Sequence, residues 1–237
     1  MTYVVPVPTL PSLPVSGGDT LFPVRRVFCV GRNYGDHARE MGADPNREPP
    51  FFFLKPADAV FTPQPPATSD DARPAVPYPP QTADLHHEVE LVVALGQGGT
   101  DLDPADALDL VWGYGVGVDL TRRDLQAEAK NLRRPWDLAK GFDFSGPCSP
   151  LRPVSEVKHP AQGRIWLSVD GSIRQEGDLG DQIWTVPEII AHLSRSVTLR
   201  PGDLIFTGTP AGVGALTRGS TVTAGIDGVG ELSFTVE

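Results

Sequence analysis

The sequence predicts an α+β fold dominated by twisted antiparallel or mixed sheets, with only short helices. Twenty-five glycines and 25 prolines among 237 residues exceed average usage, as is typical of short strands joined by many turns. Segments with strand patterns outnumber those with helical periodicity. Strands and helices do not alternate regularly, which argues against a doubly wound parallel sheet. The apolar content of 40% is sufficient for a proper core.

The chain divides into residues 1–20, predicted as an extended N-terminal arm, and residues 21–237, predicted as a single domain. In the first part of that domain, apolar runs bounded by Gly and Pro predict strands, and capping residues predict a short helix. In chain order these elements are a strand over 24–34 that ends at Gly31, a helix over 35–42, a strand over 49–60 and a proline-rich connector over 62–81.

The second part of the domain combines strands, hairpins and helices. A cap at Asp103 and a proline at the first helical position predict a helix over 103–114. Two Asp-Gly pairs, at 170–171 and 227–228, predict the turns of two hairpins. The remaining elements, in order, are a strand over 113–121, helices over 121–132 and 186–197, and a buried strand with a glycine-rich loop over 201–214.

The charge and the cysteine content exclude several classes of protein. A net charge of −10 and an isoelectric point near 4.9 argue against a general nucleic-acid binder, which needs a basic surface. Cys29 and Cys148 form neither a disulfide framework nor a CxxC metal site. The N-terminus lacks the basic region of a secretory signal, and no apolar run has membrane-spanning length. We therefore expect a soluble, cytoplasmic protein with no nucleic-acid or membrane partner.

The stretch LHHEVELVVALG, residues 85–96, carries two glutamates at alternate positions just before a strongly apolar run. Alternate residues of a strand point to the same face, so Glu88 and Glu90 would lie side by side, with Val89 and Leu91 opposite. Two neighbouring carboxylates repel each other, and burying either one without compensation is costly. Standing alone, the pair would fit a solvated strand face. If the pair is buried, a cation should lie between the two carboxylates.

A third acid, Asp119, ends the apolar strand YGVGVD where a helix begins, which is also a position typical of a helix cap. Three carboxylates at adjacent strand ends suit a hard divalent cation such as Mg²⁺ or Mn²⁺. Neither cysteine lies near these segments in the sequence, and only one of His86 and His87 could join, because neighbours on a strand face opposite ways. Three monodentate ligands would leave about three open positions, enough for a bidentate oxygen substrate and water.

Around these acids and along most of its length, the chain resembles the fumarylacetoacetate hydrolase family, and within it the short, single-domain acylpyruvate hydrolases that act on fumarylpyruvate. The matching motifs run in order from about residue 24 to the C-terminus, and they are more specific to the family than to the substrate. They are CVGRNYGDHAREMG, FFFLKPADAV, LHHEVELVVALG, GYGVGVDLTRRDLQAEAK, RPWDLAKGFD and GDLIFTGTPAGVG. The resemblance implies a mixed β-sandwich or roll fold, a homodimer and a Mg²⁺ or Mn²⁺ cofactor.

The same resemblance places the metal ligands at Glu88, Glu90 and Asp119. It places a catalytic histidine and glutamate, carried by a mobile lid helix, at His37 and Glu40. These two lie three apart and are therefore neighbours on one helical face. A carboxylate beside an imidazole orients it and helps it accept a proton, so the resemblance assigns the pair to activating water.

The resemblance also implies an active-site lysine at Lys140 and contacts to a substrate carboxylate at Arg123, Gln126 and Thr209. A lysine near a cation-bound substrate can hydrogen-bond a developing oxyanion or supply a proton. Arg123 and Gln126 lie three apart on a helix directly after Asp119, so both can face the ion. An arginine fork suits a carboxylate.

Arg32 and Lys55 each follow an apolar strand. Either could reach the distal carboxylate of a substrate, and either could equally pair with one of the 30 acids of the chain. The run REPPFFFLKPADAV indicates a roomy apolar wall that ends in Lys55, which favours the longer substrates of the family.

These features together predict a metal-dependent hydrolase that cleaves the C–C bond of an acylpyruvate, a small 2-oxo acid. Fumarylpyruvate, converted to fumarate and pyruvate in gentisate-type aromatic catabolism, is the substrate that the resemblance favours. Two rival activities use the same site: decarboxylation of oxaloacetate through the same pyruvate enolate, and isomerisation or hydration of an enol acid. A non-catalytic protein with a structural cation is the alternative from another class, and the open coordination sphere argues against it.

Overall fold

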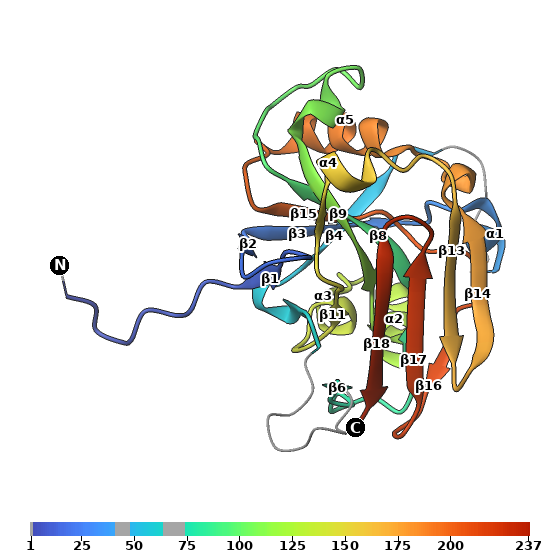
Figure 1. The fold of residues 1–237 in the computed structure, drawn as a ribbon. Coiled ribbons are helices and arrows are strands. Elements are labelled where there is room, and N and C mark those ends of the chain that lie inside the picture. The colour runs from blue at the N-terminus through green and yellow to red at the C-terminus, as the bar shows by residue number, and fades with distance from the viewer. Residues whose placement is uncertain (1, 41–47, 64–73) are drawn as a thin grey trace.

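The computed structural model describes residues 2–40, 48–63 and 74–237; the side chains of Ala38 and Glu40 lie outside the described part. Two large sheets form the body (Figure 1). Within the described residues, one sheet has the strand order β12-β9-β8-β15-β3-β4 and the other the order β14-β13-β17-β18-β6. Smaller sheets are β1-β2, β10-β7-β16 and β11-β5. Parallel and antiparallel pairs both occur, and the helices are short, so the predicted mixed α+β architecture is confirmed.

The strands of the described residues are β1 Ser12–Pro14, β2 Leu21–Pro23, β3 Arg26–Gly31, β4 Phe51–Lys55, β5 Val60–Phe61, β6 Ala75–Val76, β7 Leu85–His87, β8 Val89–Leu95, β9 Val111–Val118, β10 Thr121–Arg122, β11 Gly146–Pro147, β12 Arg152–Pro153, β13 Arg164–Val169, β14 Ser172–Asp178, β15 Asp203–Phe206, β16 Gly214–Leu216, β17 Thr221–Ile226 and β18 Gly230–Val236. The α-helices are α1 Gly35–Glu40, α2 Arg123–Asn131, α3 Asp137–Lys140, α4 Val154–Val157 and α5 Val186–Ser196. The 3₁₀ helices are η1 Ala57–Ala59, η2 Ala107–Leu110 and η3 Leu179–Asp181.

Strand β8 lies inside the six-stranded sheet and is buried along its whole length. Leu91 and Val93 belong to the main core, together with apolar residues of β13, β17, β18 and α5, whereas Val92 and Ala94 belong to a second core beneath the β1–β2 hairpin. Each buried valine or leucine side chain contributes about 1.5–3 kcal/mol. Because a slip of one residue would exchange the two faces, this packing fixes the register of β8 and the direction of Glu90.

The predicted hairpins form as expected. Asp170 and Gly171 have φ values of 52° and 76°, as required by the tight turn between β13 and β14. β17 and β18 pair antiparallel across Asp227 and Gly228. Helix α5, which carries a capping box at its start, lies over the main core (Figure 1). The second sheet and α5 thus cover the face of β8 that carries Leu91 and Val93.

The predicted helix over 103–114 is wrong. Only the 3₁₀ helix η2 forms there, and Val111 already starts β9, which pairs along its length with β8. Tyr114 is 1% exposed in the main core. The pairing with β8 buries the same apolar residues that a helix would, so tertiary packing overrides the local periodicity.

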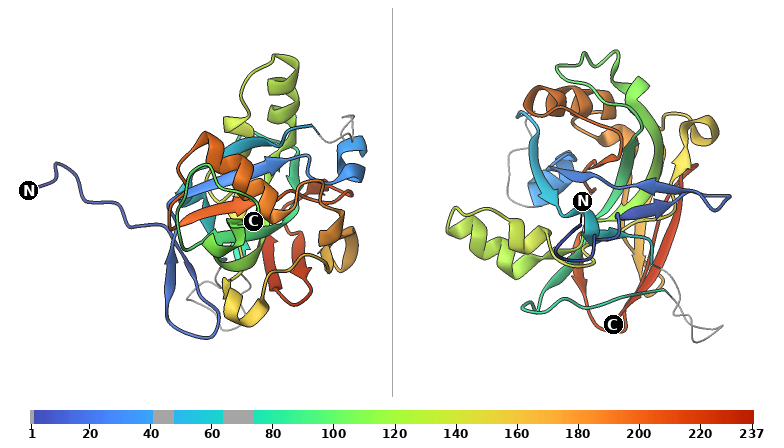
Figure 2. Two further views of the ribbon diagram at one scale, coloured as in Figure 1. Left: turned by 90° about the horizontal axis from the view of Figure 1, so that it is seen from above. Right: turned by 90° about the vertical axis from the view of Figure 1, so that its left-hand side faces the viewer.

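The N-terminal arm projects from the body (Figures 1 and 2). Exposed chain reaches residue 10, but Ser12–Pro14 form β1, and Leu13 is fully buried, so part of the predicted arm 1–20 packs on the domain. Of the predicted connector 62–81, residues 64–73 lie outside the described residues, and β6 pairs parallel with β18. No helix in the described part of the chain is long and apolar enough to cross a membrane.

Candidate active site and metal centre

The three predicted acids converge at the adjacent ends of β8 and β9. These strands pair with Val89 opposite Val118, which brings Asp119, directly after β9, beside Glu88. The Asp119 N–H donates to the Glu88 carbonyl at 2.8 Å. One carboxylate oxygen of each of Glu88, Glu90 and Asp119 lies within 4.8 Å of the others, and none of the three residues is more than 5% exposed. The site is therefore a buried carboxylate cluster, not a solvated strand face.

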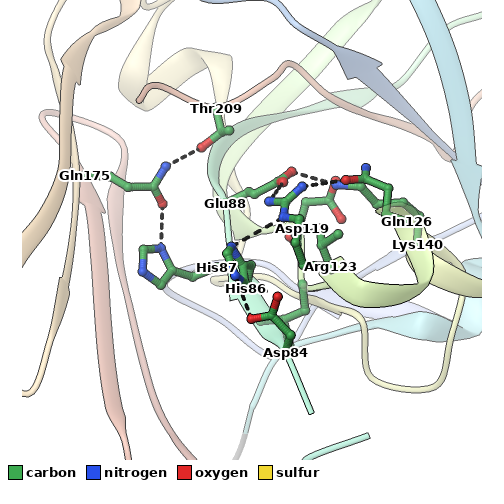
Figure 3. A network of polar contacts seen from close by, with 12 residues as sticks. Asp84, His86, His87, Glu88, Asp119, Arg123, Gln126, Lys140, Gln175 and Thr209 are labelled. Carbon is green, nitrogen blue, oxygen red and sulfur yellow. Dashed lines mark hydrogen bonds and ion pairs between the residues drawn. The ribbon is translucent and has the colours of Figure 1, made fainter. Parts of the chain in front are cut away.

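Basic side chains lie against this cluster. Lys140 Nζ, at the end of α3, is 2.6 Å from both Glu88 Oε2 and Asp119 Oδ2 (Figure 3). Lys55 Nζ is 2.7 Å from Asp119 Oδ1, and Arg123 Nη2 is 2.5 Å from Glu88 Oε1. The three acids of the cluster thus face three bases. A divalent cation bound among them would leave a net positive charge, which favours an anionic ligand.

The charges of this cluster shift its pKa values in opposite directions. Burial alone would raise the pKa of Glu88, but Lys140, Arg123 and His37 outweigh burial and hold that pKa well below its usual range. Burial, together with the charges of Asp119 and Glu88, raises the pKa of Glu90 well above its usual range. For Lys140, burial lowers the pKa, but the two paired carboxylates raise it more, so the ammonium stays charged.

The oxygen atoms of the cluster fit a hard divalent cation. Glu90 Oε2 accepts a hydrogen bond from the Gly208 N–H at 2.7 Å, which holds this carboxylate toward the other two. Asp119 Oδ1 is buried and accepts no hydrogen bond of ordinary geometry, although Lys55 lies close to it. Its negative charge is balanced by that ammonium at 2.7 Å, while the oxygen itself accepts no aligned hydrogen bond and can still ligate a metal ion. The all-carboxylate donor set fits Mg²⁺ or Mn²⁺.

Cys29 lies closer to this cluster than its sequence position suggests. It sits on β3, two strands away from β8, and its thiol is influenced by the charges of Asp119 and Lys55. Burial and the nearby carboxylates raise the thiol pKa well above its usual range. The thiolate is the form that binds metals, so Cys29 does not change the hard character of the site.

Helix α2 positions Arg123 and Gln126 as their spacing predicts. Arg123 Nη1 donates to Gln126 Oε1 at 2.6 Å, and Arg123 Nε donates to His86 Nδ1 at 3.3 Å (Figure 3). His86 in turn contacts Asp84 through Nε2 at 2.9 Å. Burial and the charge of Arg123 lower the pKa of His86, which favours the neutral imidazole that can accept from the guanidinium. Together with Glu88, these contacts fix the guanidinium through all three of its nitrogens before any ligand binds.

A small cavity of about 30 Å³ opens over the carboxylates. His37 lines it from α1 and is 7% exposed. The predicted partner Glu40 ends α1, and its side chain lies outside the described residues. The cavity brings together most of the predicted site residues; its lining is Val30, Gly31, Arg32, His37, Phe53, Glu88, Glu90, Arg123, Gln126, Lys130, Trp136, Lys140 and Thr209.

A second cavity of about 200 Å³ adjoins the first and shares Gly31, Arg32 and Trp136 with it. Its further lining consists of Glu48, Pro49, Pro50, Phe51, Ile183 and Trp184. Arg32 follows β3 in a left-handed conformation, with φ of 59°, which costs about 1–3 kcal/mol in a residue other than glycine. Such backbone strain is common at ligand sites, and here it places an arginine at the junction of the two cavities.

Lys55 lies behind the cluster, not in either cavity. Its ammonium contacts Asp119 and donates to the carbonyls of Leu120, at 3.2 Å, and Lys140, at 2.5 Å. Of the two roles that the sequence left open, contact with a distal carboxylate or pairing with an acid, this geometry corresponds to the second.

Sequence reasoning missed Gln175. This residue of β14 is fully buried and contacts His87 and Thr209 (Figure 3). The signal in the sequence is a polar residue at an inward-facing position of a hairpin strand whose other residues are exposed or half-buried. His87 points away from His86, as expected for neighbours on a strand, and reaches the second sheet.

Comparison with solved structures shows close relatives of the whole chain. A crystal structure from Burkholderia cenocepacia, named as a candidate fumarylpyruvate hydrolase, is 60% identical with a TM-score of 0.90, covering 100% of this chain and 98% of that one. Fumarylpyruvate hydrolase from Pseudomonas aeruginosa, solved in complex with Mn²⁺ and pyruvate, is 51% identical with a TM-score of 0.94, covering 99% of each chain.

Relatives by sequence carry other activities in their names. The mitochondrial oxaloacetate tautomerase FAHD1 of Rattus norvegicus is 43% identical over 213 residues, 90% of this chain and 92% of the relative. A mitochondrial oxaloacetate decarboxylase of Dictyostelium discoideum is 40% identical over 205 residues, 86% of this chain and 90% of the relative. The family model for the C-terminal domain of fumarylacetoacetate (FAA) hydrolase matches residues 26–237. The chain therefore belongs to the fumarylacetoacetate hydrolase family.

Proposed function

We propose that this protein hydrolyses the C–C bond of an acylpyruvate, with fumarylpyruvate as the preferred substrate and fumarate and pyruvate as products. The observation that carries the proposal is the second cavity, because it provides room for an acyl group beyond the site that would hold the 2-oxo acid. A dry cavity of 150 Å³ is enough for benzene, so a volume of about 200 Å³ accommodates a four-carbon acyl group.

The residues around the carboxylates would bind the 2-oxo acid end of the substrate. Arg123 and Gln126 face the small cavity from α2, and Thr209 faces it from the loop after β15. An arginine fork, an amide and a hydroxyl together suit one carboxylate. A divalent cation held by Glu88, Glu90 and Asp119 supplies Lewis-acid polarisation of the adjacent oxo group.

His37 is the residue that we assign as the general base for the attacking water. It lines the cavity over the carboxylates, and its charge is felt by Glu88. In the proposed reaction His37 accepts a proton from water, whose oxygen adds to the distal carbonyl of the substrate. The C–C bond then breaks, its electron pair passes to the pyruvate unit as an enolate, and a proton completes pyruvate. The acyl group leaves as a carboxylate.

Lys140 is placed to stabilise the negative charge that this reaction develops. Its ammonium is buried beside two carboxylates, which keep it protonated. A buried ammonium aimed at a developing oxyanion is worth much more than one in water. We assign Lys140 to donating a hydrogen bond to the enolate oxygen or to supplying the final proton.

Arg32 would bind the far end of a fumaryl group. It stands at the junction of the two cavities, between the carboxylate cluster and the aromatic walls of Trp136 and Trp184. Lys55, the other candidate for this contact, is occupied by Asp119 and two carbonyls. A substrate that ends in a second carboxylate therefore gains a partner that a neutral acyl group lacks.

An oxaloacetate activity is the second candidate, because the relatives at 40–43% identity are named as an oxaloacetate tautomerase and an oxaloacetate decarboxylase. Oxaloacetate is a 2-oxo acid that the same carboxylate-binding residues would hold. Neither its decarboxylation nor its tautomerisation uses a large acyl cavity, and neither consumes water.

A side-by-side assay tests the choice. The purified chain, loaded with Mg²⁺ or Mn²⁺, is given fumarylpyruvate, acetylpyruvate and oxaloacetate, and kcat/KM is measured for each, with keto–enol exchange of oxaloacetate followed separately. We expect the highest kcat/KM with fumarylpyruvate. A higher value for either oxaloacetate reaction overturns the proposal.

The proposal extends to the oligomeric state, the cellular location and the pathway. We expect the protein to be a homodimer in the cytoplasm that acts in gentisate-type aromatic catabolism. Light scattering after gel filtration measures the assembly directly. A mass of one chain, or of more than two, contradicts the homodimer.

A further inference from the structure

Gln175 makes four hydrogen bonds from a position with no exposed surface. Its amide oxygen Oε1 accepts from the Val89 N–H at 3.1 Å and contacts His87 Nδ1 at 2.9 Å. Its amide nitrogen Nε2 donates to the Pro210 carbonyl at 2.9 Å and to Thr209 Oγ1 at 2.7 Å. Every donor and acceptor site that this geometry offers is used, so the side chain is held in one orientation.

Two of these partners are backbone groups, which settles which end of the amide is oxygen. The Val89 N–H can only donate, so the atom facing it is the oxygen. The Pro210 carbonyl can only accept, so the atom facing it is the nitrogen. The direction of the remaining two bonds follows. His87 donates through Nδ1–H, and Thr209 accepts through Oγ1.

This direction determines where the Thr209 proton can go. The hydroxyl accepts from Gln175, and within the described part of the chain it donates no hydrogen bond of its own. Thr209 is 2% exposed and lines the small cavity with Arg123, Gln126 and Lys140. The proton is therefore available to an oxygen atom in that cavity.

The strand that carries Gln175 also supports the loop that carries Thr209. Gly212 has φ of 93°, and a Cβ there would lie 2.1 Å from the Arg174 carbonyl oxygen. A Cβ on Gly177 would lie 2.9 Å from Pro210. The loop after β15 thus lies directly on β14, in the second sheet, which is why a residue of that sheet can act on the site in the first.

We propose that Gln175 is a positioning residue that turns the Thr209 hydroxyl into an obligate hydrogen-bond donor toward the carboxylate of the bound 2-oxo acid. His87 belongs to the same hydrogen-bond network, because its Nδ1–H and the Val89 N–H hold the Gln175 oxygen away from Thr209. The inference rests on the proposed function in one respect, namely that the ligand of the small cavity is a 2-oxo acid.

The test measures binding of oxalate, a rigid dianionic analogue of the pyruvate enolate, to the Mn²⁺-loaded protein by calorimetry. Thr209→Val removes the hydroxyl, and Thr209→Ser keeps it. Gln175→Met removes the amide. Gln175→Glu keeps the acceptor for Val89 but can no longer donate, so Thr209 would give its proton to the new carboxylate. Either Gln175 variant suffices if the other does not fold.

We expect Thr209→Val, Gln175→Met and Gln175→Glu each to weaken oxalate binding about tenfold or more, the usual effect of losing one hydrogen bond to a charged group. Thr209→Ser should stay within about twofold of the wild type. In the Gln175→Met background, adding Thr209→Val should weaken oxalate binding only slightly further, because both changes remove the same hydrogen-bond donor. In turnover, KM should rise more than kcat falls.

Gln182→Met is a matched control. Gln182 Nε2 donates to Thr207 Oγ1 at 2.9 Å, and that threonine gives its proton to the Leu91 carbonyl at 3.0 Å. The control breaks the same kind of contact at a threonine that does not line the small cavity. The Gln182→Met variant should have a lower melting temperature but an unchanged affinity for oxalate.

Two results would overturn the inference. One is wild-type oxalate affinity in a folded Gln175 variant. The other is a parallel loss of Mn²⁺ affinity and oxalate affinity, since that would mean that Gln175 merely supports the loop that holds Glu90. Failure of the wild type itself to bind oxalate would contradict the proposed function instead.

Discussion

Lys55 and Asp119 form an ion pair in which neither side chain has exposed surface, with Nζ 2.7 Å from Oδ1. The lysine comes from the end of an edge strand, β4, and the acid from the end of β9, so the pair joins the two sides of the six-stranded sheet. Asp119 also receives Lys140, which reaches the opposite oxygen. One carboxylate is thus held between two buried cations.

Replacement of Lys55 by methionine should destabilise the protein strongly. The change fills most of the same volume but leaves Asp119 with one cation in place of two and leaves two carbonyls without their donor. Removing one partner of a buried pair typically costs about 3–5 kcal/mol. Thermal and denaturant unfolding measure the loss. Lys158, which is exposed, provides the control: Lys158→Met should change stability by about 0.5 kcal/mol or less. A loss of similar size in both variants would contradict this account.

Glu90→Gln should stabilise the metal-free protein and reduce its response to metal. A carboxyl whose folded pKa is raised contributes stability that is complete below its ordinary value of 4.5 and is lost as the pH rises through the folded pKa. Glutamine removes that loss and can still accept from the Gly208 N–H. In the presence of a chelator at pH 8, the variant should melt a few degrees higher, given about 2–4 °C per kcal/mol.

The same variant should gain little from added cation. In the wild type, Mn²⁺ at 100 times its Kd should add about 2.7 kcal/mol of stability. The Glu90→Gln protein lacks one anionic ligand, so its melting temperature should rise much less in a Mn²⁺ titration. An equal rise in both proteins would remove Glu90 from the metal site.

The carboxylate cluster could be predicted from the sequence because it depends on local rules. Alternation along one strand places Glu88 and Glu90 on one face, and the end of the next strand brings Asp119 beside them. The helix predicted over 103–114 failed for a non-local reason, since the same apolar residues serve a strand once β8 is available as a partner. The two Asp-Gly hairpins succeeded because their turn chemistry is contained in two residues.

Gln175 and Lys55 could not be placed in the same way. Gln175 meets His87 across 88 positions of sequence, and Lys55 meets Asp119 only through the packing of β4 against the strand ends. Nothing within a few residues of either side chain encodes those distances. A buried polar residue can be suspected from its inward-facing position, but its partner is fixed by how the two sheets pack.

His37→Ala should separate the two candidate reactions. If His37 accepts the proton of the attacking water, fumarylpyruvate hydrolysis should fall about 10²- to 10⁴-fold. Decarboxylation of oxaloacetate consumes no water, so any such activity of the wild type should persist within a few-fold. Mn²⁺ and oxalate affinities should also change little, because His37 is not a ligand in the carboxylate cluster. Steady-state kinetics and calorimetry supply these values. Equal losses for both substrates would assign His37 to binding instead.

Arg32 offers the sharpest test of substrate length, because it alone among the basic residues named for the distal end lies at the junction of the two described cavities. Arg32→Met removes the charge while keeping an unbranched side chain. We expect kcat/KM for fumarylpyruvate to fall about tenfold or more, and kcat/KM for acetylpyruvate, which has no distal carboxylate, to change less than threefold, since a hydrogen-bonded charge pair is worth about 1.5–3 kcal/mol.

The informative quantity is the ratio of kcat/KM for fumarylpyruvate to kcat/KM for acetylpyruvate. A general disturbance of the left-handed backbone at residue 32 would lower both values together and leave that ratio unchanged. Arg195→Met, on the exposed side of α5, changes the net charge by the same amount and should leave the ratio unaltered. If Arg32→Met lowers kcat/KM equally for both substrates, Arg32 supports the loop after β3 without contacting the acyl group. If it lowers neither, the second cavity does not receive the distal carboxylate, and the preference for fumarylpyruvate loses its structural basis.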